Sequence, residues 1–476
     1  MLPRPLLMPV AAALGLSACA TAGPVRPPDT TLPARFEAAA GTLESAALDR
    51  WWLGFDDAQL TALIEQALAR STDAREGAAR LAEARAVRRG ALTGFDPQGD
   101  LVVNGQGQQQ QILDSVTISF PGAEGGTNPF AQGGLIFSGN AGFDVSWELD
   151  LFGRRAAARR EADATLLAAR FDLEATRAGI AANVADALFE LRGLTAQLED
   201  ARETLRIQRQ LRDIAAERAR RGLAADPEVA RIDTDLAQSV AEEARLAADA
   251  QAARRAMLVL TGNAAAPTAT LDPAATLPPV PPAPALLPGA LLARRPDVRA
   301  AEARLAAAAG RLRLDELALF PRFTLQPGVG LSTTQGGAFD ATTLAWTLAA
   351  GVTAPILDRP RLIAQLRAQE ARVEQAVIGY ERAVQTAFSE TDQTLVRLAA
   401  DRRRIAELTA GEAAARRSFD AARELYGRGV TGLTDLLDAE RAWRAARLTL
   451  TSARVQGLRR AVQAYKAAGG GWSSMS

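Results

Sequence analysis

The side chains in this sequence that could do chemistry are almost all carboxylates and guanidinium groups. Asp and Glu number 55, Lys and Arg number 55, and the formal net charge is zero. Lys466 is the only lysine and there is no histidine, so the commonest general base and metal ligand are absent. Carboxylate-only metal binding and carboxylate-pair catalysis stay open, but no spacing singles out either. We therefore expect no enzyme activity and no cofactor, and the charge balance is unlike that of a nucleic-acid-binding protein.

The single cysteine, Cys19, lies at the end of an N-terminal apolar stretch and excludes an intrachain disulfide. Arg4 and the apolar run Leu6–Leu16 are typical of an export signal, because the run is too short to span a bilayer as a helix. The tripeptide Leu-Ser-Ala before Cys19 resembles the lipobox of bacterial lipoproteins. That resemblance implies cleavage before Cys19, a lipid on Cys19 and, since Ala20 follows, sorting to the outer membrane. The alternative is an ordinary secretory signal with an incidental cysteine.

Two halves of the sequence resemble each other, which predicts an internal twofold repeat. The displacement is 224 residues between Asp73 and Asp297, and 206 residues between Asp186 and Asp392. We attribute the difference to a longer loop in the first half. The expected segments are a signal peptide (1–18), a lipidated extended segment (19–56), a first repeat (57–262), a proline-rich linker (263–290), a second repeat (291–466) and a tail (467–476).

Each repeat is expected to contain a helix, two strands, a long helix, a tight turn and a further helix. The first repeat has expected helices at 57–92, 155–221 and 228–261 and strands at 101–109 and 136–147. The second has helices at 297–319, 361–426 and 434–466 and strands at 322–332 and 343–354.

Apolar residues in the first long helix recur in alternating steps of four and three, as in a coiled coil. They include Ile180, Val184, Ala187, Leu191, Leu194 and Leu198. A helix over the 67 residues from Arg155 to Arg221 would be about 100 Å long. Such a helix is too long for a compact domain, so we expect rods packed against similar rods.

The expected strands alternate between apolar and polar residues over about ten positions. Leu344, Trp346 and Leu348 share one face of the last strand, a pattern that suits a transmembrane barrel. Soluble hairpins are the alternative. Four strands are too few to close a barrel, because known barrels have about eight or more. If the strands span a membrane, several chains must share one barrel. No later apolar run is long enough for a spanning helix, which excludes an inner-membrane transporter.

Five motifs in this order resemble those of the TolC-like outer-membrane factors, in particular the OprM-like lipoprotein branch that serves drug efflux. They are Arg50-Trp51-Trp52 with Phe55-Asp56-Asp57, Trp147-Glu148-Leu149-Asp150-Leu151-Phe152-Gly153-Arg154, Arg294-Arg295-Pro296-Asp297-Val298-Arg299, Leu319-Phe320-Pro321-Arg322 and Ala354-Pro355-Ile356-Leu357-Asp358. The resemblance implies a mainly helical homotrimer. Its long antiparallel helices would form an α-barrel in the periplasm, and four strands per chain would contribute to one twelve-stranded β-barrel. It also implies a periplasmic adaptor protein and an RND-type inner-membrane transporter as partners.

A channel in the outer membrane needs a device that closes it, and the two glycine-containing helix turns are the natural place. The first turn contains Gly222 and Leu223, and the second contains Gly429 and Val430; the resemblance implies that these tips meet the adaptor. It further implies a gate formed by Glu228, Tyr426, Asp435 and Asp438, whose acids would form rings of negative charge around the pore. The alternative is that Glu228 and Asp435 only interact with the dipole of a helix N-terminus.

Three functions remain to be separated. The favoured one is the exit duct of a tripartite system for small molecules such as drugs. A duct for type I protein secretion is the nearest rival. A coiled-coil structural lipoprotein without a pore would explain the helices and Cys19, but not the paired amphipathic strands.

Overall fold

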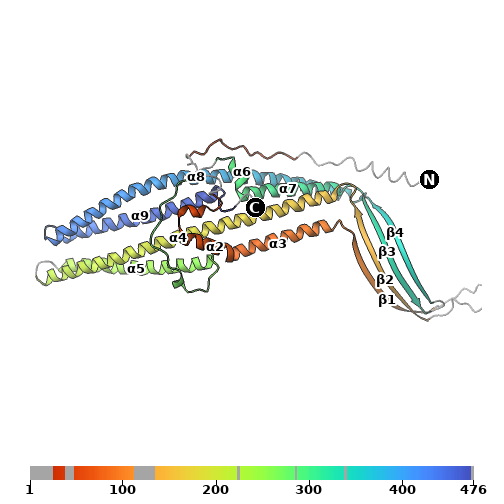
Figure 1. Cartoon of the computed structure of the whole chain (residues 1–476), viewed down its shortest axis with the longest axis horizontal. Helices are drawn as coiled ribbons and strands as arrows, with labels where there is room; N and C mark the ends of the chain where they lie inside the picture. The colour runs from red at the N-terminus through yellow and green to blue at the C-terminus, as the bar shows by residue number, and fades with distance from the viewer. Residues whose placement is uncertain are drawn as a thin grey trace, which may run out of the picture. The chain divides into compact units, whose positions relative to one another are not determined.

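The computed structural model describes residues 25–37, 48–111, 134–221, 226–284, 287–336 and 340–472. These residues fold into two compact units. The first comprises residues 25–26, 84–111, 134–166, 304–336 and 340–376, which include the four strands. The second contains most of the helical residues, within 27–83, 167–303 and 377–472. The helices and strands are labelled in Figure 1.

The first unit contains an antiparallel sheet in which the strands follow one another in chain order. The strands are β1 (Gln98–Gln110), β2 (Gly134–Leu149), β3 (Arg322–Gln335) and β4 (Ala341–Thr353), and they lie side by side in Figure 1. Each is longer than the pattern of alternation predicts, by one to three residues at most ends. Among the described residues, no strand pairs with the outer edge of β1 or of β4.

The register of the sheet brings the apolar residues of all four strands onto one face. Leu101 lies opposite Phe143, which lies opposite Val329, which lies opposite Trp346. The exposed fractions of Leu101 and Trp346 are 72% and 82%. Because side chains alternate between the faces of a strand, the polar residues Asp100 and Asp144 fall on the other face. The predicted alternation is confirmed, and its apolar face is open.

The helices that precede the strands are α2 (Ala58–Arg70), α3 (Thr72–Thr93) and α7 (Pro296–Leu317). A short helix, α6 (Ala290–Arg294), and two 3-10 helices, η3 (Trp51–Phe55) and η4 (Thr268–Thr270), complete the connections. No helix among the described residues is both long and apolar enough to cross a membrane.

The prediction of a single helix over 57–92 is wrong, because the helix is interrupted at Ser71. The backbone of Ser71 is extended, with ψ of 150°. Its hydroxyl oxygen accepts a hydrogen bond from the N–H of Ala74 at 3.2 Å, so Ser71 ends α2 and begins α3. A serine that caps a helix in this way leaves the apolar periodicity unchanged, and periodicity was the only signal that the prediction used.

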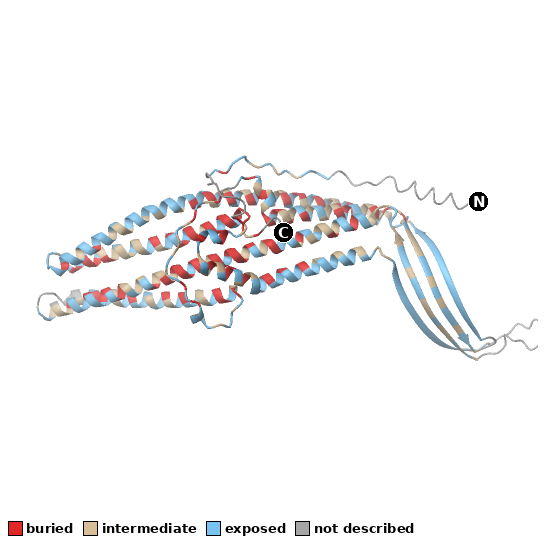
Figure 2. Ribbon diagram, viewed as in Figure 1, coloured by how far each residue is buried: buried red, intermediate tan, exposed pale blue. Residues whose placement is uncertain are grey.

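The long helices form two antiparallel hairpins (Figure 1). The first consists of α4 (Arg154–Arg220) and α5 (Asp226–Leu260), and the second of α8 (Arg359–Gly427) and α9 (Leu433–Ala467). The two longest have 67 and 69 residues, and α5 and α9 have 35 each. Their buried residues recur along one side or two sides of each helix, as the alternation of red and blue in Figure 2 shows. The expected rods are therefore present.

Buried arginines bind the segments of the second unit together. Arg192 of α4 forms an ion pair with Asp57, which also accepts the N–H of Leu60 and so caps α2. Arg295 is 8% exposed and donates to Asp297 at 2.6 Å and to Glu390 of α8 at 2.8 Å. Two of the five sequence motifs thus supply structural ion pairs. The pair of Arg192 with Asp57 would be costly to break, because both side chains are buried.

Candidate functional site

The turn between α8 and α9 is built by the residues that the sequence singles out. Gly429 has a φ of +75°, a conformation that costs a glycine little. The N–H of Gly429 donates to the carbonyl of Tyr426, and the N–H of Val430 donates to that of Leu425, both at 3.0 Å. These bonds satisfy carbonyls at the end of α8. Val430 is 68% exposed at the turn, where a partner could reach it.

Tyr426 lies inside an apolar cluster to which all four long helices contribute, and it is only 6% exposed. The other buried members are Ile207, Leu211, Ala215, Ile232, Phe419, Leu433, Leu436 and Leu437. This cluster ties the first hairpin to the second close to their tips. The side chain of Tyr426 therefore packs against neighbouring helices of its own chain.

Asp435 and Asp438 are both exposed but have different partners. One carboxylate oxygen of Asp435 accepts the N–H of Gly432 at 3.4 Å, at the start of α9. That contact is the helix-terminus role that the sequence left open beside a gating role. Asp438 instead pairs with Arg441 at 3.2 Å, and its side chain is 60% exposed.

Arg441 connects the two hairpins and was not identified from the sequence. Its Nη2 donates to both carboxylate oxygens of Asp235 on α5, at 2.7 and 2.9 Å. The side chain of Asp235 is only 15% exposed. Because Arg441 also contacts Asp438, one guanidinium group joins a nearly buried acid to an exposed one. The spacing of Asp438 and Arg441 is an ordinary helical i, i+3 pair, and nothing in the sequence points to Asp235.

A further acid near the tip, Glu440, is almost fully buried, with an exposed fraction of 1%. Burial raises the pKa of its carboxyl group above the ordinary value, although the positive charges of Arg444 and Arg441 oppose this effect. Arg444 lies 3.6 Å from Glu440 and donates to Ser239 of α5 at 3.3 Å. Two arginines of α9 thus contact polar residues of α5.

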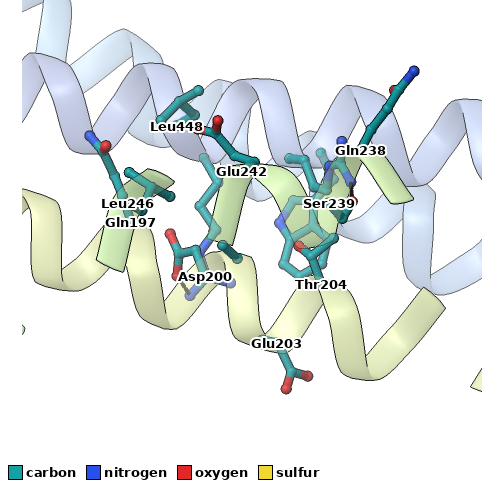
Figure 3. Close-up of a pocket in the computed structure, with 13 residues that line it drawn as sticks. Gln197, Asp200, Glu203, Thr204, Gln238, Ser239, Glu242, Leu246 and Leu448 are labelled. Carbon is teal, nitrogen blue, oxygen red and sulfur yellow. Dashed lines mark hydrogen bonds and ion pairs between the residues drawn. The ribbon is translucent and has the colours of Figure 1, made fainter. Parts of the chain in front are cut away.

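A groove lies between α4, α5 and α9 (Figure 3), and Ser239 and Arg444 are among the residues that line it. Asp200 of α4 pairs in it with Arg447 of α9 at 2.5 Å. The guanidinium of Arg447 lies over the ring of Trp443, at 5.5 Å from its centre, and Trp443 stacks on Phe419 at 5.1 Å. Trp443 itself lines the groove, together with apolar residues such as Leu246 and charged residues such as Glu242.

Other expected site residues lie outside what can be described. Cys19, Gly222 and Leu223 fall outside the described residues, and for Glu228 only the helical backbone within α5 is described. Among the described residues, no group of three or more acidic or sulfur-bearing side chains is arranged to hold a metal ion. Near the tip, the pair of Arg441 with Asp235 is an ion pair between the two hairpins.

Comparisons with known proteins find relatives over almost the whole chain. The sequence profile of the family described as outer membrane efflux protein matches residues 63–263 and 287–470. The chain is 30% identical to the pyoverdine export outer membrane protein OpmQ of Pseudomonas putida, over all of this chain and 99% of that protein. It is 28% identical to the cation efflux system protein CusC of Escherichia coli, over 98% of this chain and 99% of that protein.

Solved structures show the same fold. The outer-membrane channel OprN has a TM-score of 0.79 and 29% sequence identity, over 95% of this chain and 99% of that one. The open state of the Neisseria gonorrhoeae MtrE outer membrane channel has a TM-score of 0.79 and 26% identity, over 96% and 99% of the two chains. The chain belongs to the outer membrane efflux protein family.

Proposed function

We propose that three copies of this chain form the exit duct of a tripartite efflux system in the outer membrane. The observation that carries the proposal is the open apolar face of a four-stranded sheet whose two edges pair with no other strand in the described part of the chain. Exposed edges and a large exposed apolar face are both costly in water. Pairing β4 of each copy with β1 of the next would satisfy the edges, close a twelve-stranded barrel and turn the apolar face to lipid.

The internal twofold repeat is part of the same proposal. The hairpin helices α5 and α9 have equal lengths, and α4 and α8 differ by two residues. Two similar halves in each of three copies would give a ring of six similar units. Such a ring suits a duct because each unit meets the next in nearly the same way.

Trimer formation and conductance test the duct. Outer-membrane fractions are expected to contain a trimer that survives detergent on ice and dissociates on boiling, and the purified trimer is expected to form channels in a planar lipid bilayer. A monomer that remains in the periplasmic fraction would contradict the proposal and favour the structural lipoprotein.

The cargo is proposed to be small molecules such as drugs, which an inner-membrane RND-type transporter and a periplasmic adaptor deliver. Support comes from the family and from relatives named for pyoverdine export and cation efflux. Deleting the gene should raise sensitivity to several small toxic compounds and leave protein secretion unchanged. Loss of a secreted protein from the medium, with unchanged drug sensitivity, would favour the type I secretion alternative.

The gate is proposed to lie at the helix tips, where Asp435 and Asp438 are exposed on α9. Threefold symmetry would turn each acid into a ring, and Glu228 would join the constriction. Tyr426, which is buried among helices of its own chain, would line the constriction only after a rearrangement of the tip. Replacing Asp435 and Asp438 together by asparagine should increase the single-channel conductance in a planar bilayer. Unchanged conductance would show that neither acid belongs to the gate. The role of Asp435 would then be its contact with Gly432 at the start of α9. The turns at Gly222, Leu223, Gly429 and Val430 are proposed to contact the adaptor.

Cys19 is proposed to carry the lipid that anchors the mature chain to the outer membrane. Several acyl chains, at about 0.8 kcal/mol per buried CH₂ group, make a firm anchor. Radioactive palmitate should label the wild-type protein and not a Cys19→Ser variant. Equal labelling of both proteins would contradict the proposal.

A further inference from the structure

The helices α9 and α5 have the same length but are covered differently. α9 contacts α8, because Arg460 pairs with Asp401 at 2.8 Å. It also contacts α4, because Arg459 pairs with Glu190 at 2.9 Å. α5 packs against α4 through Leu246 and Ala250, while Ala248 and Ala252 on its other side are exposed. One side of α5 is therefore uncovered where α9 is covered.

A matching uncovered side runs along α8. Val396 is 42% exposed, and Ala399 and Arg403 are also exposed. The three residues are spaced by three and four, so they lie on one side of the helix. An apolar or small residue on an exposed helix side is unremarkable alone, but here two such sides belong to two helices of one chain.

The contact between α4 and α9 shows how two such sides fit together. A Cβ atom added to Gly193 of α4 would lie 2.5 Å from a methyl group of Val455 on α9, so these helices approach closely at this point. Gln197 of α4 and Gln456 of α9 line the same small cavity beside it. The ion pair of Glu190 with Arg459 completes this contact.

The proposed repeat gives each of these residues a counterpart. A displacement of 206 residues takes Gly193 of α4 to Ala399 of α8, and a displacement of 207 takes Ala248 of α5 to Val455 of α9. The contact of Gly193 with Val455 therefore corresponds to a contact of Ala399 with Ala248. In the same register Gln197 corresponds to Arg403, and Gln456 to Asp249.

We propose that α8 of each copy packs against α5 of the next copy, in the register of the α4–α9 contact, with Ala399 against Ala248 and Arg403 paired with Asp249. This inference rests on the proposed trimer and adds the residues that join its helical part. The seam between α8 and α5 would cover Val396 and Ala252, which correspond to the charged pair Glu190 and Arg459. It would therefore be a more apolar contact than the one within each chain.

Charge complementarity favours a second copy over another protein at this surface. Asp249 has a side chain that is 45% exposed and is already held by Arg245 at 2.6 Å. Arg403 is exposed on α8 and would bring an opposite charge to that acid. A carboxylate between two arginines is a stable arrangement, because each arginine stabilises the charged form of the acid.

Disulfide cross-linking of the full-length protein tests the seam. A disulfide needs Cα atoms about 4.4 to 6.8 Å apart, which the proposed register provides at Ala399 and Ala248. The Ala399→Cys/Ala248→Cys variant, oxidised in isolated outer membranes, is expected to give a covalent trimer on boiled non-reducing gels. The control is Ala399→Cys/Thr234→Cys, because Thr234 lies on the same side of α5 but two heptads, or about 21 Å, away.

The outcomes separate this inference from the proposed function. A heat-dissociable trimer that forms normally but does not cross-link, or that cross-links through Thr234, would overturn the seam and leave the duct intact. Absence of any trimer would overturn both. A second arm uses charge: Arg403→Glu should lower the melting temperature of the trimer by a few degrees, and adding Asp249→Arg should restore part of it. Arg402→Glu, at the neighbouring exposed position, should have no such effect.

Discussion

Arg441 donates from one nitrogen to both carboxylate oxygens of Asp235, at 2.7 and 2.9 Å, although 206 residues separate them in the chain. The pair joins the α4–α5 hairpin to the α8–α9 hairpin, a few helical turns from their tips. Any movement that spreads the tips of one chain has to stretch or break this contact. The contact also places Asp438, an expected gate residue, beside the same guanidinium group.

Replacing Arg441 by glutamine should therefore loosen the tips. We expect a higher single-channel conductance and a loss of about 1 kcal/mol of stabilisation per chain, because the pair is only partly exposed. Conductance in a planar bilayer and thermal dissociation of the trimer measure the two effects.

The matched control is Arg454→Gln, an exposed arginine elsewhere on α9, which should change neither quantity. The exchange variant Asp235→Arg/Arg441→Asp should recover part of the closed behaviour. Wild-type conductance in Arg441→Gln would show that this pair does not hold the tips together.

Asp186 on α4 gives the stability a dependence on pH. Burial raises the pKa of its carboxyl group to about 6, although Arg459 and Lys466 oppose the shift. The buried oxygen Oδ1 has no hydrogen-bond partner among the described residues. Because the folded chain holds this proton more tightly than the unfolded chain, the stability falls as pH rises from about 4 to about 6.

The variant Asp186→Asn should remove this part of the dependence and raise the melting temperature at pH 7 more than at pH 4. Thermal dissociation of the trimer across this range measures it. The control Asp213→Asn replaces an exposed acid of the same helix. An identical gain at both pH values would contradict the assignment of the titration to Asp186.

A short extended segment near the N-terminus packs against α8. We expect the loss of one aromatic contact to detach it. Phe36 is 9% exposed and stacks on Phe388, with 5.6 Å between the ring centres. The N–H of Glu37 donates to Asp392 and the N–H of Asp29 donates to Glu381, both at 2.8 Å. Loss of the Phe36 ring would cost about 3 kcal/mol of this local packing.

In the variant Phe36→Ala, we expect trypsin to cleave after Arg35 at least ten times faster than in the wild type. Val25→Ala, at a residue that is 45% exposed, is the control and should be cleaved at the wild-type rate. Mass spectrometry of the early fragments identifies the site. Equal rates for all three proteins would mean that the ring does not hold the segment.

The close approach of α4 and α9 at Gly193 leaves no room for a side chain. Its added Cβ atom would lie 2.5 Å from Val455, so Gly193→Ala should destabilise the trimer by about 1–3 kcal/mol through overpacking. The second substitution Val455→Ala should recover most of that loss. Gly179→Ala is the control, because a Cβ there meets nothing within 4 Å. Additive losses in the double variant would exclude the steric explanation.

The sequence alone determined the features that depend on neighbours along the chain. The strand alternation of residues such as Leu344 and Trp346 has a period of two, and the seam from Ile180 to Leu198 has the coiled-coil period. Glycine at 429 marked a turn because few other residues adopt its backbone conformation. The interruption of the first helix at Ser71 could not be predicted, because a hydroxyl cap does not disturb the apolar pattern.

Tertiary structure alone decided which distant groups meet. The pairing of Arg441 with Asp235 and the burial of Glu440 and Asp186 depend on which sides of which helices face each other. A charged residue on a helix has the same local signature whether it faces water or another helix. Only packing, which removes water from some charges and brings partners to others, distinguishes them.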